Sequence, residues 1–226
     1  RFLTALIVVI LAIPACTVTP VDKQLSAGNE ATLDAAALYL GSVFDSAMNT
    51  LELIASTPEA KRGDWEGIKP YMLRQQSTLP GVYFFVLPNG NYYSTEKDFT
   101  NLNLSDRDYF ISLMSGNTVK GIPIYSRSSG EKSALVAAPV IANDQVVGAL
   151  GISIFLDELV ARVNRAIAFP QDYTWFVVNS GGVSMLDSEP EFIFMNALTQ
   201  GSVSLRNAVA EALKHESGKT EYALET

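Results

Sequence analysis

The chain has 226 residues, of which 48% are hydrophobic and 18% charged, so it can bury a sizeable core in one or two domains. Its formal net charge of -8, with no cluster of lysines or arginines, opposes the counterion release that drives nucleic-acid binding, and we exclude nucleic acid as a partner. One cysteine and one histidine exclude an internal disulfide and leave carboxylates as the main ligands for any metal. We therefore expect no metal site and no cofactor.

The first fifteen residues have the pattern of a signal or anchor segment. After Arg1, residues 2–13 form an apolar run that is shorter than the ~20 residues a membrane-spanning helix needs. The run leads into Pro14, Ala15 and Cys16, and a small residue before a cysteine at this place resembles the lipobox of bacterial and some archaeal lipoproteins. Cys16 would then carry lipid. The other interpretation is a membrane helix clipped at its start, and both place the rest outside the cytoplasm, anchored to the membrane.

Two helices are predicted after a short tether. Residues 16–28 lack periodicity and are predicted to be the tether. Apolar residues then recur at three- and four-residue steps, which predicts a helix of more than twenty residues that ends near Pro58. The residues of this stripe are Leu33, Ala37, Leu40, Phe44, Ala47, Leu51 and Ile54. Asp64 is placed to cap a second helix, which Pro80 stops.

An antiparallel sheet is predicted between residues 80 and 156. It begins with a hairpin that turns at Asn89-Gly90, continues with a short helix and ends with three strands. The predicted ranges are 82–87, 92–93, 106–114 (helix), 122–127, 133–140 and 146–155. The fold class is therefore α+β, rather than a doubly wound parallel sheet.

A second, smaller unit is predicted after a linking helix at residues 156–167. A strand at 174–178, a turn at 179–182, a short strand to Leu186 and a helix near 205–213 begin to repeat the first layout. We expect this unit to be built like the first, but cut short at Thr226.

These elements and their local motifs resemble the double Cache family, the extracellular sensor domains of chemoreceptors and sensor kinases. The motifs lie at residues 83–95, 104–110 (LSDRDYF), 124–130 (IYSRSSG), 137–140 (AAPV), 147–151 (VGALG) and 156–159 (LDEL), and residues 175–188 look like the start of a repeat. The resemblance implies two PAS-like subdomains on a long N-terminal helix. Residues 29–156 would form that helix and the membrane-distal subdomain, and residues 157–226 the linking helix and a partial membrane-proximal subdomain.

The resemblance also implies a ligand between the sheet and the helix that carries Arg107. A planar guanidinium can hold a carboxylate with two parallel hydrogen bonds, and Arg107, Tyr109 and Tyr125 are the leading ligand contacts. The other interpretation is that Arg107 pairs with a neighbouring aspartate or a loop carbonyl and only pins the helix. Tyr83 and Phe85 share one face of their strand and are candidates for the apolar wall, although either face of this strand could supply it.

The ligand class follows from two positions of the same resemblance. Family members that recognise amino acids add an aspartate on the last strand of the distal unit and a tryptophan two residues after the arginine. Ser153 and Tyr109 occupy these positions here. Because a buried ammonium without a carboxylate partner is costly, we expect a small carboxylate or another polar metabolite rather than an amino acid.

We expect no catalytic residues. Ser129 and Lys132 match a Ser-x-x-Lys pattern, but they fall on a glycine-containing turn and lack the partner motifs of serine acyl enzymes. The expected function is extracytoplasmic sensing of a small molecule, passed to a partner protein, a homodimer or a further domain. The other interpretation is a lipid-anchored cell-surface binding or structural lipoprotein that keeps the sensor fold without signalling.

Overall fold

A computed structural model describes residues 7–12, 23–169 and 173–215. The chain divides into two compact units, one formed by residues 41–159 and the other by residues 1–40 with 160–226.

The helix α1 (Lys23–Ala55) is continuous over 33 residues. Its buried side chains include Leu40, Phe44, Leu51 and Ile54, which confirms the predicted apolar stripe. The helix begins earlier than predicted, within the segment interpreted as a tether, where lysine, glutamine, leucine and alanine all favour helical backbone.

Two short helices follow and lead into the sheet. α2 (Pro58–Lys61) is capped by Thr57, whose hydroxyl accepts a hydrogen bond from the amide of Ala60. α3 (Trp65–Gln76) is capped by Asp64, whose carboxylate accepts from the amide of Gly67 at 3.2 Å. The predicted cap is therefore confirmed.

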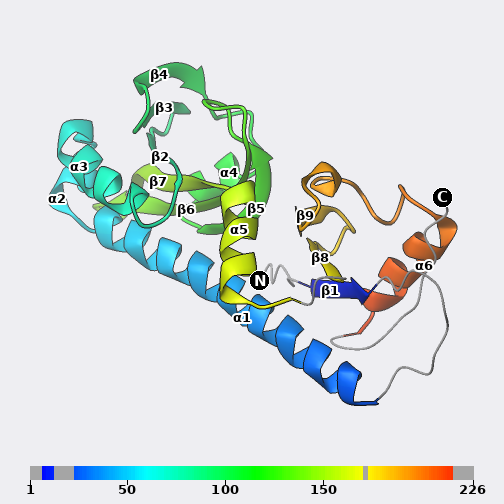
Figure 1. Cartoon of the computed structure of the whole chain (residues 1–226). Coiled ribbons are helices and arrows are strands. Elements are labelled where there is room, and N and C mark those ends of the chain that lie inside the picture. Colours follow the sequence, from blue (N-terminus) through cyan, green and yellow to red (C-terminus); the bar gives the residue numbers. More distant parts are fainter. Residues whose placement is uncertain (1–6, 13–22, 170–172, 216–226) are drawn as a thin grey trace. The chain divides into compact units, whose positions relative to one another are not determined.

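The larger unit contains an antiparallel sheet, as predicted, but with six strands instead of the five expected, in the order β4-β3-β2-β7-β6-β5 (Figure 1). Its strands are β2 (Gly81–Val86), β3 (Asn91–Ser94), β4 (Asp98–Asn103), β5 (Val119–Tyr125), β6 (Lys132–Ala142) and β7 (Gln145–Phe155). The helix α4 (Phe110–Met114) is shorter than predicted, because residues 105–109 form turns instead.

Strand register divides the side chains of this sheet between two faces. Phe84 lies opposite Gly151, and Val86 lies opposite both Ala149 and Tyr92, so these residues share one face, which we call the α4 face. Phe110 and Leu113 of α4 pack there in one core cluster with Phe84 and Tyr92. The alternate residues point to the opposite face.

On that opposite face, Phe85 is completely buried. The corner between α2 and α3 lies against it, since a Cβ on Gly63 would come within 3.7 Å of the Phe85 ring. Tyr83 shares this face by alternation, and its hydroxyl donates to the carbonyl of Leu79 at 3.3 Å.

The second unit holds a smaller antiparallel sheet of order β1-β8-β9, formed by β1 (Ile7–Ala12), β8 (Tyr173–Val178) and β9 (Ser184–Asp187). Trp175 of β8 is buried, stacks on Phe169 with ring centroids 5.6 Å apart, and donates to the side chain of Asn164 at 2.8 Å. Asn164 belongs to α5 (Leu156–Ala166). The remaining elements are the 3-10 helix η1 (Pro190–Phe192) and the helix α6 (Val203–Ala212). The strand, turn, strand and helix predicted for this unit are therefore all present.

Part of the segment interpreted as a signal or anchor is a strand in this structure. Residues 7–12 form β1, which pairs antiparallel with β8 over six residues. A run of isoleucines and valines suits β structure because branching at Cβ favours extended backbone. No helix within the described ranges is both long and apolar enough to cross a membrane. Cys16 lies outside the described residues.

Candidate functional site

Two loops approach each other beside the α4 face. The first joins β4 to α4 and is made of turns, with the amide of Arg107 donating to the carbonyl of Leu104 at 3.0 Å. The second joins β5 to β6, where the amide of Gly130 donates to the carbonyl of Ser126 at 2.8 Å. Gly130 has a φ of +78°, which explains the glycine at this position.

Each of these two loops carries an arginine whose side chain donates hydrogen bonds to the other loop or to the residues at its start. Arg107 of the first loop donates from Nη2 to the carbonyl of Tyr125 at 2.9 Å. Arg127 of the second loop donates from Nη1 to the carbonyl of Asn103 at 2.5 Å and from Nη2 to the Asp106 carboxylate at 2.7 Å. We call this reciprocal arrangement of Arg107 and Arg127 the arginine clasp.

A pair of tyrosines, Tyr92 and Tyr109, lies within electrostatic reach of both guanidinium groups of the clasp. Both tyrosines are buried, and Tyr92 contacts Phe84 edge to face with ring centroids 6.1 Å apart. Burial raises the pKa of Tyr109 to about 12, although the two arginines act in the opposite direction. Burial also raises the pKa of Tyr92. Both hydroxyls therefore stay protonated near neutral pH and can donate a hydrogen bond.

Two polar atoms of this cluster are buried without a hydrogen-bond partner among the described residues: the hydroxyl of Tyr92 and Nε of Arg107. The hydroxyls of Ser128 and Thr100 lie close enough to influence the pKa of Tyr92, but neither meets hydrogen-bond geometry with it. An unsatisfied buried polar group costs about 1–3 kcal/mol. Both atoms can donate, so an acceptor oxygen would satisfy them, and an anionic oxygen would form the stronger hydrogen bonds.

The structure brings together part of the set predicted from the sequence. Arg107 and Tyr109 lie in the cluster, and Tyr125 contributes its backbone carbonyl, although the residue as a whole is 54% exposed. Ser153 is buried on the α4 face, opposite Leu135 of the same core. Tyr83 and Phe85 do not join them, because they lie on the other face of the sheet.

Tyr92 and Arg127 were not predicted to be site residues. Arg127 lies two residues after Tyr125 in the IYSRSSG motif, and this closeness to a predicted ligand contact could have marked it as a site residue. Tyr92 follows the Asn89-Gly90 turn, but its face depends on a register that the turn sequence does not fix.

Neither a metal-binding group nor the helix-borne serine of an acyl enzyme is found among the described residues. Among them, no group of three or more His, Cys, Asp or Glu side chains is arranged to hold a metal ion. Ser129 lies in the β5–β6 turn, where its hydroxyl accepts from the amide of Glu131 at 3.3 Å, rather than at the start of a helix.

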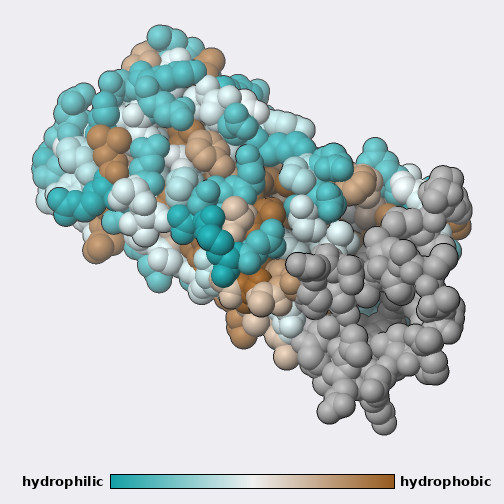
Figure 2. Space-filling model, in the orientation of Figure 1, coloured by the Kyte–Doolittle hydropathy of each residue, from teal (hydrophilic) through white to brown (hydrophobic). Residues whose placement is uncertain are grey.

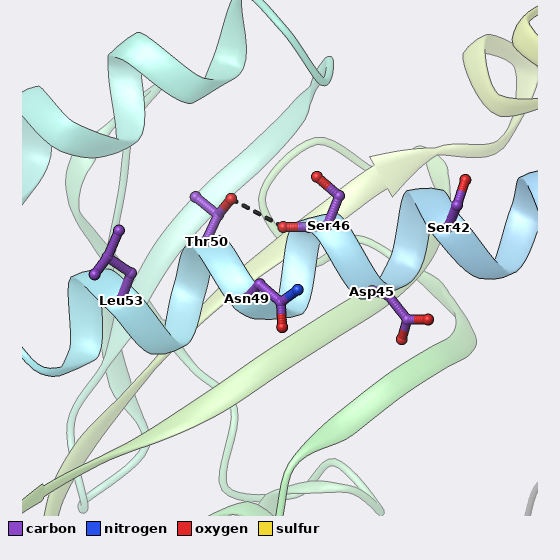
Figure 3. A pocket seen from close by; sticks show the side chains of 6 residues that line it. All are labelled: Ser42, Asp45, Ser46, Asn49, Thr50 and Leu53. Carbon is purple, nitrogen blue, oxygen red and sulfur yellow. Dashed lines mark hydrogen bonds between the residues drawn. The ribbon is translucent and has the colours of Figure 1, made fainter.

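A separate recess of about 500 Å³ follows the outward side of α1. Figure 3 shows the residues that line it, all from this one helix: Ser42, Asp45, Ser46, Asn49, Thr50 and Leu53. The Thr50 hydroxyl donates to the carbonyl of Ser46, and Asp45 forms an ion pair with Lys120.

In Figure 2 the surface around β3, β4 and α3 is mostly hydrophilic, with scattered apolar residues.

Comparisons with known proteins identify the fold. No family model matches the chain, and no curated protein matches it either. Among solved structures, the ligand-binding domain of the Pseudomonas aeruginosa amino acid chemoreceptor PctC, in complex with GABA, is 15% identical, with a TM-score of 0.63 over 80% of this chain and 82% of that one.

Two further structures agree. The ligand-binding domain of the Pseudomonas fluorescens chemoreceptor CtaA, in complex with L-valine, has a TM-score of 0.66 at 13% identity over 78% of this chain and 80% of that chain. The sensor domain of the Vibrio cholerae histidine kinase DctB has a TM-score of 0.63 at 16% identity over 86% and 79%. The chain therefore has the fold of the ligand-binding sensor domains of chemoreceptors and histidine kinases.

Proposed function

We propose that the unit formed by residues 41–159 binds a small carboxylate and that the protein is an extracytoplasmic sensing module. The observation that carries this proposal is a pair of buried donors, the Tyr92 hydroxyl and Arg107 Nε, that have no hydrogen-bond partner in the described part of the chain. A carboxylate beside Arg107 would accept from Nε. Tyr92 and Tyr109 are both close enough to Arg107 for its charge to lower their pKa values, so a tyrosine hydroxyl is the second donor we propose for this carboxylate.

The solved structures of similar fold support binding of small molecules. This chain differs from the expected amino-acid-binding pattern at one position that affects the choice of ligand. PctC and CtaA were solved with amino acids. An amino acid brings an ammonium group, which needs an anionic or polar acceptor when it is buried. At the position where we expected the family's aspartate, this chain has Ser153, so we favour acids without an ammonium group.

Thermal unfolding of the full chain, with a panel of organic acids, amino acids, amines and nucleobases, tests the proposal. A ligand present at a hundred times its Kd stabilises the folded state by ~2.7 kcal/mol, which is a clear shift in melting temperature. We expect a carboxylate to shift the wild-type protein and to have no effect on Arg107→Ala.

Two other outcomes would have different meanings. If the same acid shifts Arg107→Ala equally, Arg107 only pins its loop through the Tyr125 carbonyl, to which it donates at 2.9 Å. If no compound shifts the wild type, a cell-surface binding or structural lipoprotein that keeps the sensor fold replaces the sensing proposal.

We further propose that the N-terminal segment anchors the protein outside the cytoplasm. The support is the apolar run that ends at Ala15 and Cys16 in a pattern similar to a lipobox. Processing before Cys16 would remove residues 7–12, which pair with β8 in this structure, so lipidation requires the smaller sheet to be stable without β1. The mass of the mature protein, isolated from the membrane of its native host, tests lipidation at Cys16, because acyl chains on this residue would raise it. Signalling would then pass to a partner protein or a second copy through a shift in the population of conformations.

A further inference from the structure

The two arginines near Tyr92 and Tyr109 differ in whether a carboxylate neutralises their charge. Arg127 is already neutralised by Asp106, at 2.7 Å, and it also donates to the carbonyl of Asn103. Arg107 donates only to a carbonyl among the hydrogen bonds of the described residues, and its Nε has no partner there. Of the two arginines, Arg107 is therefore the one whose charge is left for a ligand. Lys97 also reaches the β5–β6 loop, where it donates to the carbonyl of Ser128 from an exposed position.

Asp106 is well placed to control the second charge. Its side chain is 65% exposed, and that of Arg127 is 28% exposed, so the pair lies at the rim of the cluster rather than inside it. Both arginines lower the pKa of Tyr109, so both are near the place where we propose the ligand carboxylate to bind. Removing the charge of Asp106 would leave a second guanidinium facing that place.

We infer that Asp106 determines specificity: by neutralising Arg127 it sets the site to ligands with one anionic group. This inference rests on the proposed function. A ligand with a second carboxylate would find Arg127 already paired and would be repelled by Asp106. Without Asp106, the same carboxylate could pair with Arg127 in a charge-assisted hydrogen bond.

Three four-carbon acids that differ at one end make a matched set of probes. Butyrate ends in a methyl group, succinate in a second carboxylate and 4-aminobutyrate in an ammonium. We expect the wild-type protein to bind butyrate most tightly of the three. Asp106→Asn keeps the shape of the side chain and should raise affinity for succinate about fivefold, the size typical of a partly exposed ion pair, with little change for butyrate.

Asp108→Asn is the matched control, because it removes the same charge from the same loop at an exposed position. Titration calorimetry at low ionic strength limits screening of these charges. The inference is overturned if Asp106→Asn and Asp108→Asn change succinate binding equally, or if the wild type prefers succinate or 4-aminobutyrate. Either result leaves small-molecule binding itself intact.

If the wild type binds none of the three acids, the wider panel of compounds decides the proposed function, and the Asp106→Asn variant still decides the inference. Succinate binding gained by this variant, and absent from Asp108→Asn, supports control by Asp106. No gain overturns it.

Discussion

Replacing Gly151 with alanine is expected to destabilise the larger unit by about 3 kcal/mol, the upper part of the range for overpacking a core. A Cβ at this position would lie 2.2 Å from the Phe84 ring, far inside van der Waals contact. Phe84 is buried and packs with Tyr92 and the α4 side chains in one core cluster, so any shift of its ring would displace these neighbours. Urea denaturation of the purified chain measures the change.

Gly41→Ala is the control for this prediction. A Cβ on Gly41 meets nothing within 4 Å, and the residue lies inside α1, so alanine should raise stability by about 0.5–1 kcal/mol. A second mutation, Phe84→Leu, should restore part of the loss in Gly151→Ala by shortening the ring. A neutral effect of Gly151→Ala would show that Phe84 does not pack across β7 as described.

The second large effect is expected from Asp187→Asn in the smaller unit. Asp187 is 6% exposed, and burial raises the pKa of its carboxyl from 3.8 to about 6. The protonated carboxyl is thus favoured in the folded state, and the stability it contributes is present below pH 3.8 and lost as the pH rises through 6. Asparagine is neutral at every pH and avoids this loss.

We therefore expect Asp187→Asn to be more stable than the wild type by about 1–3 kcal/mol at pH 8 and equally stable at pH 4. The amide oxygen of asparagine can still accept from the backbone of Glu189, which donates to Asp187 at 2.9 Å. Asp34→Asn, at an exposed position of the same unit, is the control. Denaturation at both pH values decides: a gain of equal size at pH 4 would contradict ionisation as the cause.

The helices and most strands could be predicted because their signals are local. Asp64 caps α3, and the apolar stripe of α1 is buried, as periodicity indicated. The strand β4 was not predicted. It carries Asp98 and Asn101 at positive φ, and residues of this kind in this conformation are more typical of turns than of strands.

The candidate site depends on strand register, which is not local. A two-residue turn at Asn89-Gly90 would place Tyr92 opposite Leu87, on the face of Tyr83 and Phe85. In the structure the amide of Gly90 donates to the carbonyl of Leu87, and Tyr92 lies opposite Val86 instead. This shift of one residue moves Tyr92 to the α4 face, beside Tyr109.

The roles of the arginines were likewise hidden because they depend on contacts between loops. Asp106 and Arg127 are twenty-one residues apart, and nothing in either motif indicates that they form an ion pair. The motif that contains Arg107 predicted a ligand contact. It did not indicate that the Arg107 side chain donates to the carbonyl of Tyr125, which the structure shows.

The most direct test of the account is Tyr92→Phe, measured for both stability and binding of the acid that shifts the wild type. Because the Tyr92 hydroxyl is buried without a partner among the described residues, its removal should leave the ligand-free protein as stable as before, or more stable by about 1 kcal/mol. Binding of the acid should weaken about tenfold, since a hydrogen bond to a charged group is lost. Tyr93→Phe, on the other face of β3, should leave binding unchanged. A Tyr92→Phe protein that loses stability and keeps full affinity would show that this hydroxyl supports the core and does not contact the ligand.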